Sequence, residues 1–347
     1  MDAEGRRPDL SVVVCTNRSP ECLGKSLEAL HGQTVRDRLE VIVVDDGAPA
    51  PLGPLCGRFG ARLLVHPENL GLAAARNTGW RAARAPVVAF TDDDCRPAPC
   101  WAETLLSAYL DPSVMAAGGE VRPGGVKGLL GRYYLLKPPI APLESELAGD
   151  PSLAQRLKLY LLANVRDGAR SGRREVSSLP GASMSVRRCA LEAVGGFDPA
   201  IRFGGEDEDF FYRLRRELPG AKLLFEPEAQ MEHDFSGGTV DMLRRARSYG
   251  RGNARNFVKH PDWGPTLFPV PLAFLALVAA GSRRHWLLLA AALLPMAASP
   301  RFTIKALRQR SPGLALLAWL QLLEEAASDV GFVSGYFLAR RQLGAAQ

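Results

Sequence analysis

Four short apolar runs, each followed by a segment with helical periodicity, occupy the first 110 residues and restrict the fold more than any other feature. The runs are rich in Val, Ile and Leu without polar alternation, which is typical of strands buried on both faces. They lie at residues 10–14, 39–44, 62–65 and 86–90, and a further strand is expected at 114–121. We therefore expect an α/β fold with a mainly parallel, Rossmann-like sheet covered by helices on both faces.

Polar side chains follow three of these strands, at Thr16 to Arg18, at Asp45-Asp46 and at Asp92 to Asp94. The carboxyl ends of parallel strands lie at one edge of a sheet, and ligands bind beyond that edge. These groups should therefore converge on one cleft. The segment from Asn69 to Asn77, which opens the helix after the third strand, is expected at the same edge.

The acidic triplet Asp92-Asp93-Asp94 leaves the fourth strand. Side chains alternate along an extended backbone, so Asp92 and Asp94 should share one side while Asp93 points away. Two carboxylates on one side suit Mg²⁺ or Mn²⁺, with the other positions left to water and phosphate. The simpler alternative is an acidic loop that caps the helix expected at 99–110.

A second cluster of acids, Glu206 to Asp209, follows paired glycines and opens a helix expected to continue to Arg216. Acids favour a helix N-terminus, but four exceed what a cap needs, and a carboxylate there can accept a proton from an acceptor hydroxyl. Helical geometry alone does not decide which of the four faces the cleft.

His233 follows two edge strands expected at 222–225 and 229–232. A single histidine is usually structural. Its position at the end of a strand, soon after the acidic cluster, makes it a candidate third metal ligand.

Charge is unevenly distributed along the chain. Residues 1–240 hold 29 Lys+Arg and 32 Asp+Glu, whereas residues 241–347 hold 14 and 5. A tail that is both basic and apolar indicates an anionic membrane surface rather than nucleic acid as a partner. The six cysteines show no zinc-site spacing, and residues 1–8 lack signal-peptide character, which favours reduced thiols in a cytosolic domain.

The tail is expected to begin with a helix at 239–259, whose Arg244, Arg247, Arg251 and Arg255 share a face. Two apolar runs follow, Leu267 to Ala280 and Trp286 to Ala298, each shorter than the ~20 residues of an ordinary membrane span. We expect a re-entrant or shallow hairpin, with the catalytic domain on the cytoplasmic face of the plasma membrane.

In their order and spacing, these motifs together resemble glycosyltransferase family 2, the inverting nucleotide-sugar transferases with the GT-A fold. The resemblance covers about residues 10–260. It rests on Thr16-Asn17-Arg18, V-V-D-D-G ending at Gly47, N-L-G-L-A-A-A-R-N from Asn69, T-D-D-D from Thr91, G-A-S-M-S-V-R-R from Gly181, V-G-G-F-D, G-G-E-D-E-D and His233.

The resemblance implies a role for each matching position, a divalent Mg²⁺ or Mn²⁺ ion, a nucleotide-diphosphate sugar as donor, and a glycan, glycolipid or polyprenyl-linked acceptor. Without the Q-x-x-R-W motif of processive synthases, the chain is expected to add one or few sugars. The implied residues are Thr16, Asn17, Arg18, Asp46, Asn69, Arg76, Asp92 and Asp93 for the donor, Asp92, Asp94 and His233 for the metal, Gly181 and Glu206 for the acceptor, and Asp207 as catalytic base.

The expected organisation is a GT-A domain at 8–240, a basic linker helix at 241–263 and an apolar, membrane-associated helical region at 264–347. Within the domain, 1–112 would form the nucleotide-sugar half and 113–240 the acceptor half, with an insertion at 123–175.

Two other functions stay open. A sugar-phosphate nucleotidylyltransferase would normally carry a glycine-rich loop after its first strand, which Cys15 to Pro20 lacks, and a non-catalytic nucleotide- or glycan-binding module would not need the intact acids.

Overall fold

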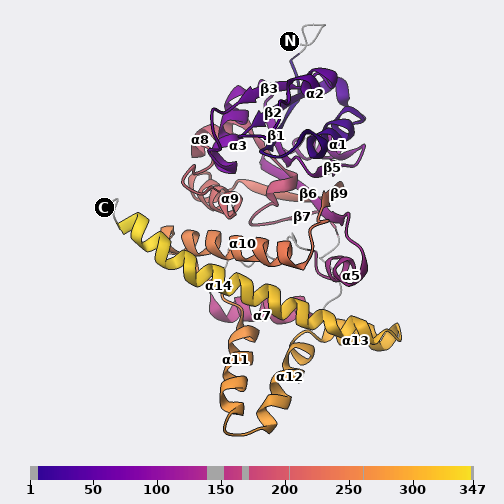
Figure 1. Cartoon of the computed structure of the whole chain (residues 1–347). Coiled ribbons are helices and arrows are strands. Elements are labelled where there is room, and N and C mark those ends of the chain that lie inside the picture. Colours follow the sequence, from indigo (N-terminus) through magenta and orange to yellow (C-terminus); the bar gives the residue numbers. More distant parts are fainter. Residues whose placement is uncertain (1–6, 139–151, 166–171, 203, 261, 345–347) are drawn as a thin grey trace. The chain divides into compact units, whose positions relative to one another are not determined.

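The structure is a computed structural model that describes residues 7–138, 152–165, 172–202, 204–260 and 262–344 (Figure 1). Contacts divide these residues into two compact units. The first holds the described residues up to 124 and those from 172 to 234, and the second holds those of 125–165 and from 235 onward. The described helices of the predicted insertion thus group with the C-terminal helices, not with the domain expected at 8–240.

One mixed sheet forms the centre of the first unit. The strand order is β3-β2-β1-β4-β8-β6-β9-β5, and β7 pairs with β9. The strands are β1 (Leu10–Thr16), β2 (Leu39–Asp45), β3 (Arg62–Val65), β4 (Val87–Asp92), β5 (Cys95–Pro97), β6 (Val114–Gly124), β7 (Arg174–Glu175), β8 (Met184–Arg187) and β9 (Lys222–Asp234).

The predicted parallel arrangement holds for β1 to β4, and β6 and β9 also pair in parallel. Strand β1 lies between β2 and β4, parallel to both, and all its residues are buried. Strand β8 runs antiparallel to β4, because β8 begins beside the carboxyl end of β4, with Met184 opposite Phe90. The second half of the sheet is mixed: β6 runs parallel to β9, whereas β5 and β7 run antiparallel to β9. The two edge strands expected at 222–232 are the single strand β9.

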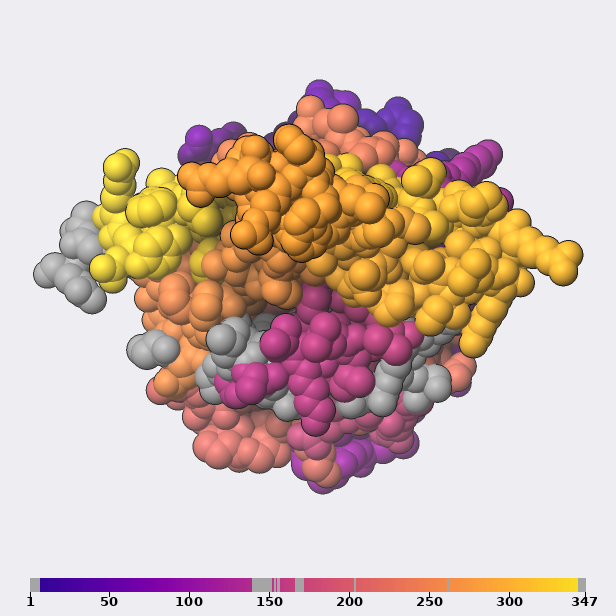
Figure 2. All heavy atoms as spheres, turned by 90° about the horizontal axis from the view of Figure 1, so that it is seen from below, coloured from indigo at the N-terminus to yellow at the C-terminus, as the bar shows by residue number. Residues whose placement is uncertain are grey.

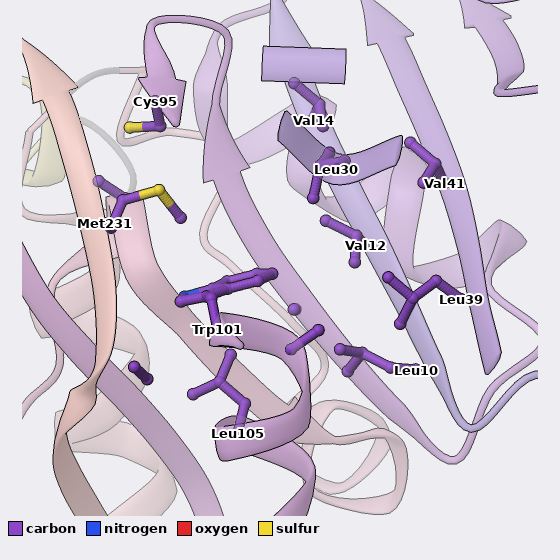
Figure 3. Packing of buried hydrophobic residues seen from close by; sticks show 14 of the residues in the cluster. Leu10, Val12, Val14, Leu30, Leu39, Val41, Cys95, Trp101, Leu105 and Met231 are labelled. Atoms are coloured by element: carbon purple, nitrogen blue, oxygen red, sulfur yellow. The ribbon is translucent and has the colours of Figure 1, made fainter. Parts of the chain in front are cut away.

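Helices cover both faces of this sheet. Leu10, Val12 and Val14 of β1 point to one face, where they pack with Trp101 (Figure 3). The intervening Val13 points to the other face. The alternation places an apolar core on each side of the sheet. The helices of this unit are α1 (Pro20–His31), α2 (Gly53–Arg58), α3 (Leu72–Ala82), α4 (Trp101–Ala108), α8 (Arg188–Val194) and α9 (Glu206–Glu217).

The second unit is helical in its described residues. Its two longest helices, α10 (Thr239–Lys259) and α14 (Leu317–Gly344), pack closely because Gly250, Gly331 and Gly335 allow the backbones to approach. A Cβ at Gly331 would lie 2.1 Å from the Arg247 carbonyl oxygen. On α10, Arg244, Arg247 and Arg251 are exposed, whereas Arg255 donates to Gln342. The helices are α5 (Gly128–Leu136), α7 (Leu153–Val165), α10 (Thr239–Lys259), α11 (Pro269–Gly281), α12 (Trp286–Ala298), α13 (Pro300–Arg308) and α14 (Leu317–Gly344).

Polar contacts connect the insertion helices α5 and α7 to α14. The Tyr133 hydroxyl and the Lys137 ammonium both donate to Glu324. The Tyr160 hydroxyl donates to Glu325 at 3.0 Å. These bonds explain why helices separated by about 190 residues form one unit.

The two predicted apolar runs of the tail are the helices α11 and α12. Among the described residues, no single helix combines the length and apolar character needed to cross a membrane. The pair α12 and α13 meets the requirement jointly, but it is bent by 78°.

A substitution at Gly79 of α3 tests how closely this helix packs against the sheet. A Cβ at this position would lie 2.2 Å from Cγ1 of Val13 in β1. We expect Gly79→Ala to lower the free energy of unfolding by ~1–3 kcal/mol, because the core must move to admit the methyl group. Urea denaturation measures this change.

Gly57→Ala is the matched control, because Gly57 lies in α2 with no atom within 4 Å of an added Cβ. It should leave stability unchanged or raise it slightly through helix propensity. Equal denaturation midpoints for the two variants would contradict the close packing of α3.

Candidate active site

The acidic triplet and His233 meet at the edge of the sheet. After β4 the chain turns into β5, which pairs with β9 so that Cys95 lies opposite His233. His233 Nε2 is 3.5 Å from Asp94 Oδ1 and 4.0 Å from Asp92 Oδ2. The ligand atoms of these three residues and of Cys95 all lie within 4.8 Å of one another. The structure thus brings together the predicted metal ligands and adds Cys95, which the sequence analysis missed.

This cluster fits a divalent ion such as Mg²⁺ or Mn²⁺. Ligand atoms about 2.1 Å from one ion lie roughly 3–4 Å apart, which is the spacing of the two carboxylates and the imidazole. Mg²⁺ and Mn²⁺ prefer carboxylate oxygen to the soft sulfur of a thiol, so Cys95 is the least suited of the four ligands. The fitting set is therefore Asp92, Asp94 and His233.

Asp93 points away from the cluster, as the alternation predicted. The Thr16 hydroxyl donates to Asp93 Oδ2 at 2.5 Å. Arg18 lies 3.7 Å from Asp93 and donates to Asp94 Oδ2, the oxygen not directed at His233. The neighbouring Asn17 is exposed. The segment after β1 therefore supplies a half-exposed guanidinium beside the candidate metal ligands Asp92, Asp94 and His233.

Asp46 organises the loop that leads into α3. Its carboxylate accepts hydrogen bonds from the backbone N–H groups of Leu70 and Gly71 and lies 2.7 Å from Nδ1 of His66. His66 also contacts Thr78 of α3 through Nε2 at 2.8 Å. Asp46 is only 4% exposed, and its carboxylate is occupied by these bonds. It therefore fixes the shape of the loop that is predicted to line the donor site. A lone histidine in the sequence had given no signal of this contact.

Asn69 belongs to the same loop. The Arg202 guanidinium donates to its backbone oxygen at 2.6 Å and to its side-chain oxygen at 3.0 Å. These bonds join the loop before α3 to the segment before α9.

Arg76 is a buried cation that connects both halves of the site. It donates to Glu206 Oε1 at 2.7 Å and to the Gly181 carbonyl oxygen at 3.2 Å. Its guanidinium also lies 3.6 Å from Asp92 Oδ1. Arg76 thus lies beside both the acidic triplet and Glu206, and its predicted role in donor binding stays a prediction.

The four acids that open α9 have different surroundings. Glu206 is 3% exposed and bound to Arg76, and Asp209 is fully buried and paired with Arg213 at 2.9 Å. Asp207 is partly exposed, and its Oδ2 accepts the Gly181 N–H at 2.9 Å. Glu208 is partly exposed as well, but Asp207 is the acid that combines access to solvent with a hydrogen bond to Gly181, which Arg76 also contacts.

Burial raises the pKa of the Glu206 carboxyl to about 7, although the neighbouring Arg76 opposes this shift. Glu206 has one carboxylate oxygen without a hydrogen-bond partner among the described residues. The predicted acceptor contact of Glu206 stays a prediction, because its carboxyl is directed at Arg76.

Comparison with known proteins adds independent information. The profile of "Glycosyl transferase family 2" matches residues 11–178, and that of "Glycosyl transferase family group 2" matches residues 160–319. The chain is 34% identical over 260 residues to the pre-mycofactocin glycosyltransferase of Mycobacterium tuberculosis, covering 73% of this chain and 48% of that protein. It is 35% identical over 279 residues to the validoxylamine A glucosyltransferase of Streptomyces hygroscopicus, covering 75% and 63%. The chain thus spans about half to under two thirds of these relatives.

A mannosyltransferase from Pyrobaculum calidifontis, solved with GDP-Man and Mn²⁺, has a similar structure. The TM-score is 0.57 at 21% identity, and the match covers 95% of this chain and 88% of that one. At this identity the match shows a shared fold.

Metal binding should depend on Asp94 and not on its neighbour Asp93. We expect Asp94→Asn to lower Mn²⁺ affinity at least ~10-fold, because the change removes an anionic ligand. Asp93→Asn is the matched control, because its carboxylate faces Thr16 and Arg18. Isothermal titration calorimetry with Mn²⁺ alone measures both, and an equal loss in the control would argue against the assigned ligand set.

Glu206 should make stability depend on pH. Its pKa of about 7 in the folded state exceeds the ordinary value of 4.5, so the folded state binds the extra proton between these values. Stability should therefore fall as the pH rises from about 4.5 to about 7, and Glu206→Gln should remove this part of the decline. Denaturation midpoints at acidic and alkaline pH test it, with the exposed Glu192→Gln as control. Parallel pH curves for wild type and Glu206→Gln would refute the assignment.

Proposed function

Because the chain belongs to glycosyl transferase family 2 and has the GT-A fold, we propose that it is a metal-dependent, inverting and non-processive glycosyltransferase. It moves a sugar from a nucleotide-diphosphate sugar to a hydroxyl of a glycan, glycolipid or polyprenyl-linked acceptor. The observation that supports this best is the chain of contacts from the cluster of Asp92, Asp94 and His233 through Arg76 to Gly181 and Asp207.

Asp92, Asp94 and His233 would hold the divalent ion, which offsets the negative charge growing on the departing diphosphate. Arg18 is half-exposed beside this cluster and can turn its guanidinium toward a phosphate group. Thr16 and the loop fixed by Asp46 would line the nucleotide side of the site.

Asp207 would act as general base. Its carboxylate removes the proton of the acceptor hydroxyl while that oxygen attacks the anomeric carbon, and the bond from this carbon to the diphosphate breaks on the opposite side. The Gly181 N–H donates to Oδ2 and the Glu208 N–H donates to Oδ1, and each oxygen keeps a second lone pair that can accept the proton. Asp209 is less suited to this role, because it is buried and paired with Arg213.

The reaction products distinguish this proposal from the main alternative. Glycosyl transfer releases a nucleoside diphosphate, whereas a nucleotidylyltransferase would form or consume pyrophosphate. A thermal-shift screen of nucleotide sugars with Mn²⁺ identifies the donor, and product analysis follows. Metal-dependent stabilisation by a nucleotide sugar with release of nucleoside diphosphate supports the proposal, and pyrophosphate formation contradicts it.

Asp207→Asn tests the base directly. The amide keeps the size and can still accept the Gly181 N–H, but it cannot take up a proton. We expect turnover to fall by ~10²-fold or more with donor affinity changed only a few-fold. Steady-state kinetics together with donor titrations measure the two effects separately.

Asp209→Asn serves as the control from the same turn of α9. Its cost should appear mainly as lower stability, because Arg213 loses its buried partner. Near-normal turnover in Asp207→Asn, beside a large loss in a folded Asp209→Asn, would move the base to Asp209.

A further inference from the structure

Helices α11 and α12 lie side by side and extend from the other helices of the second unit (Figure 1). Their outward residues are apolar and exposed: Leu275 is 62%, Leu289 is 64% and Trp286 is 65% exposed. The remaining large exposed side chains of the pair are Leu272, Val278, Leu288 and Leu293. A helix on the surface of a soluble protein normally directs such residues to a core.

The exposed positions surround much of the hairpin and are not restricted to one stripe. On each helix they fall around roughly half or more of the circumference. The base of the hairpin is packed, since Val270 joins Tyr160 and Leu322 in a small apolar cluster there, and Ala291 is buried further along α12. Figure 2 shows the hairpin, in orange, standing in front of α14 and beside α7.

Along the sequence, the charged residues of the hairpin and its flanks have one sign, although Asp329 of α14 accepts the Phe268 N–H at its base. Residues 263–323 contain no Asp or Glu and six Lys or Arg. Arg283 and Arg284 lie in the connection between the helices, next to Trp286, and all three are exposed. Tryptophan beside basic residues is typical of the boundary between lipid headgroups and acyl chains. The basic residues complement an anionic surface, and their charges would be unfavourable in an apolar protein interface.

We propose that the α11–α12 hairpin is immersed in an anionic lipid bilayer and holds the chain at the membrane. A second protein copy or a partner would cover one face of the hairpin, whereas lipid covers every exposed side. Each helix of 13 residues is ~20 Å long, less than the ~30 Å hydrocarbon thickness. The hairpin therefore enters the bilayer without crossing it by itself. Its tip comes close to the opposite leaflet, and the long side chains of Arg283 and Arg284 extend toward the headgroups of that leaflet.

Vesicle flotation of the full chain tests this proposal. We expect the wild type to float with vesicles of phosphatidylethanolamine and phosphatidylglycerol, and more weakly with phosphatidylcholine alone. The double variant Leu275→Glu with Leu289→Glu should lower the bound fraction at least ~10-fold, because it places two charges in the acyl region. Both side chains are exposed, so the fold should persist, and an unchanged helical circular dichroism signal with a single thermal transition confirms that it does.

Leu110→Glu is the matched control, because Leu110 is an exposed leucine (86%) of the first unit. It should float like the wild type. The proposal fails if the wild type stays with the lipid-free fraction, or if the double variant floats normally. It also fails if the wild type forms an oligomer without lipid that the double variant dissociates while vesicles bind neither protein.

Tryptophan fluorescence gives a second readout. Trp80, Trp101 and Trp263 are buried and Trp319 is half-buried against Phe274 at the base of the hairpin, whereas Trp286 is exposed at its tip. Brominated lipids should quench the wild type, and Trp286→Phe should remove most of this quenching. Quenching that persists unchanged in Trp286→Phe would place the hairpin outside the lipid and overturn the proposal. These results do not depend on the proposed transfer reaction.

Discussion

The buried guanidinium of Arg76 is the interaction on which the rest of the candidate site depends. It neutralises Glu206 and lies beside Asp92, two carboxylates that burial would otherwise disfavour. Removing one partner of a buried ion pair typically costs ~3–5 kcal/mol, because the remaining charge stays desolvated. Arg76 also binds the Gly181 carbonyl, while the Gly181 N–H binds Asp207. One side chain therefore contacts a candidate metal ligand and, through one glycine, helps to position the proposed base.

The direction of the strands brings these groups to the same edge. Strand β8 starts opposite the end of β4, so Gly181 lies beside the acidic triplet even though about 90 residues separate them. In the same way, β5 pairs with β9 and brings His233 to Asp94. The mixed second half of the sheet, which the sequence analysis did not foresee, is thus what completes a site that parallel strands alone leave open.

The second unit buries several polar side chains and exposes several large apolar ones. Its buried residues include Asn164, Gln321 and Glu325, and Gln321 donates to both of the others. Its α11–α12 hairpin, by contrast, exposes leucines and a tryptophan. Buried polar groups that satisfy one another can fix how helices associate when the apolar surface is directed outward. This arrangement agrees with the proposed contact with lipid.

The sequence by itself determined the first four strands, their helices and the identity of the metal-ligand candidates. Local signals were sufficient there, because burial on both faces leaves unbroken apolar runs and alternation separates Asp93 from Asp92 and Asp94. The lengths of α11 and α12 were equally readable. Among the four acids of α9, however, local geometry gave no choice, and the assignment to Asp207 came from family resemblance.

Only the tertiary structure decided the strand directions in the mixed second half of the sheet, the pairing of Arg76 with Glu206, the contacts of His66 and Cys95, and the grouping of α5 and α7 with α14. It also distinguished Asp207 from Asp209 by burial. Each of these features joins residues distant in sequence, or depends on what covers a side chain. Periodicity and propensity describe a segment and its own neighbours, whereas the free energy of a buried charge depends on the partner that the fold brings to it.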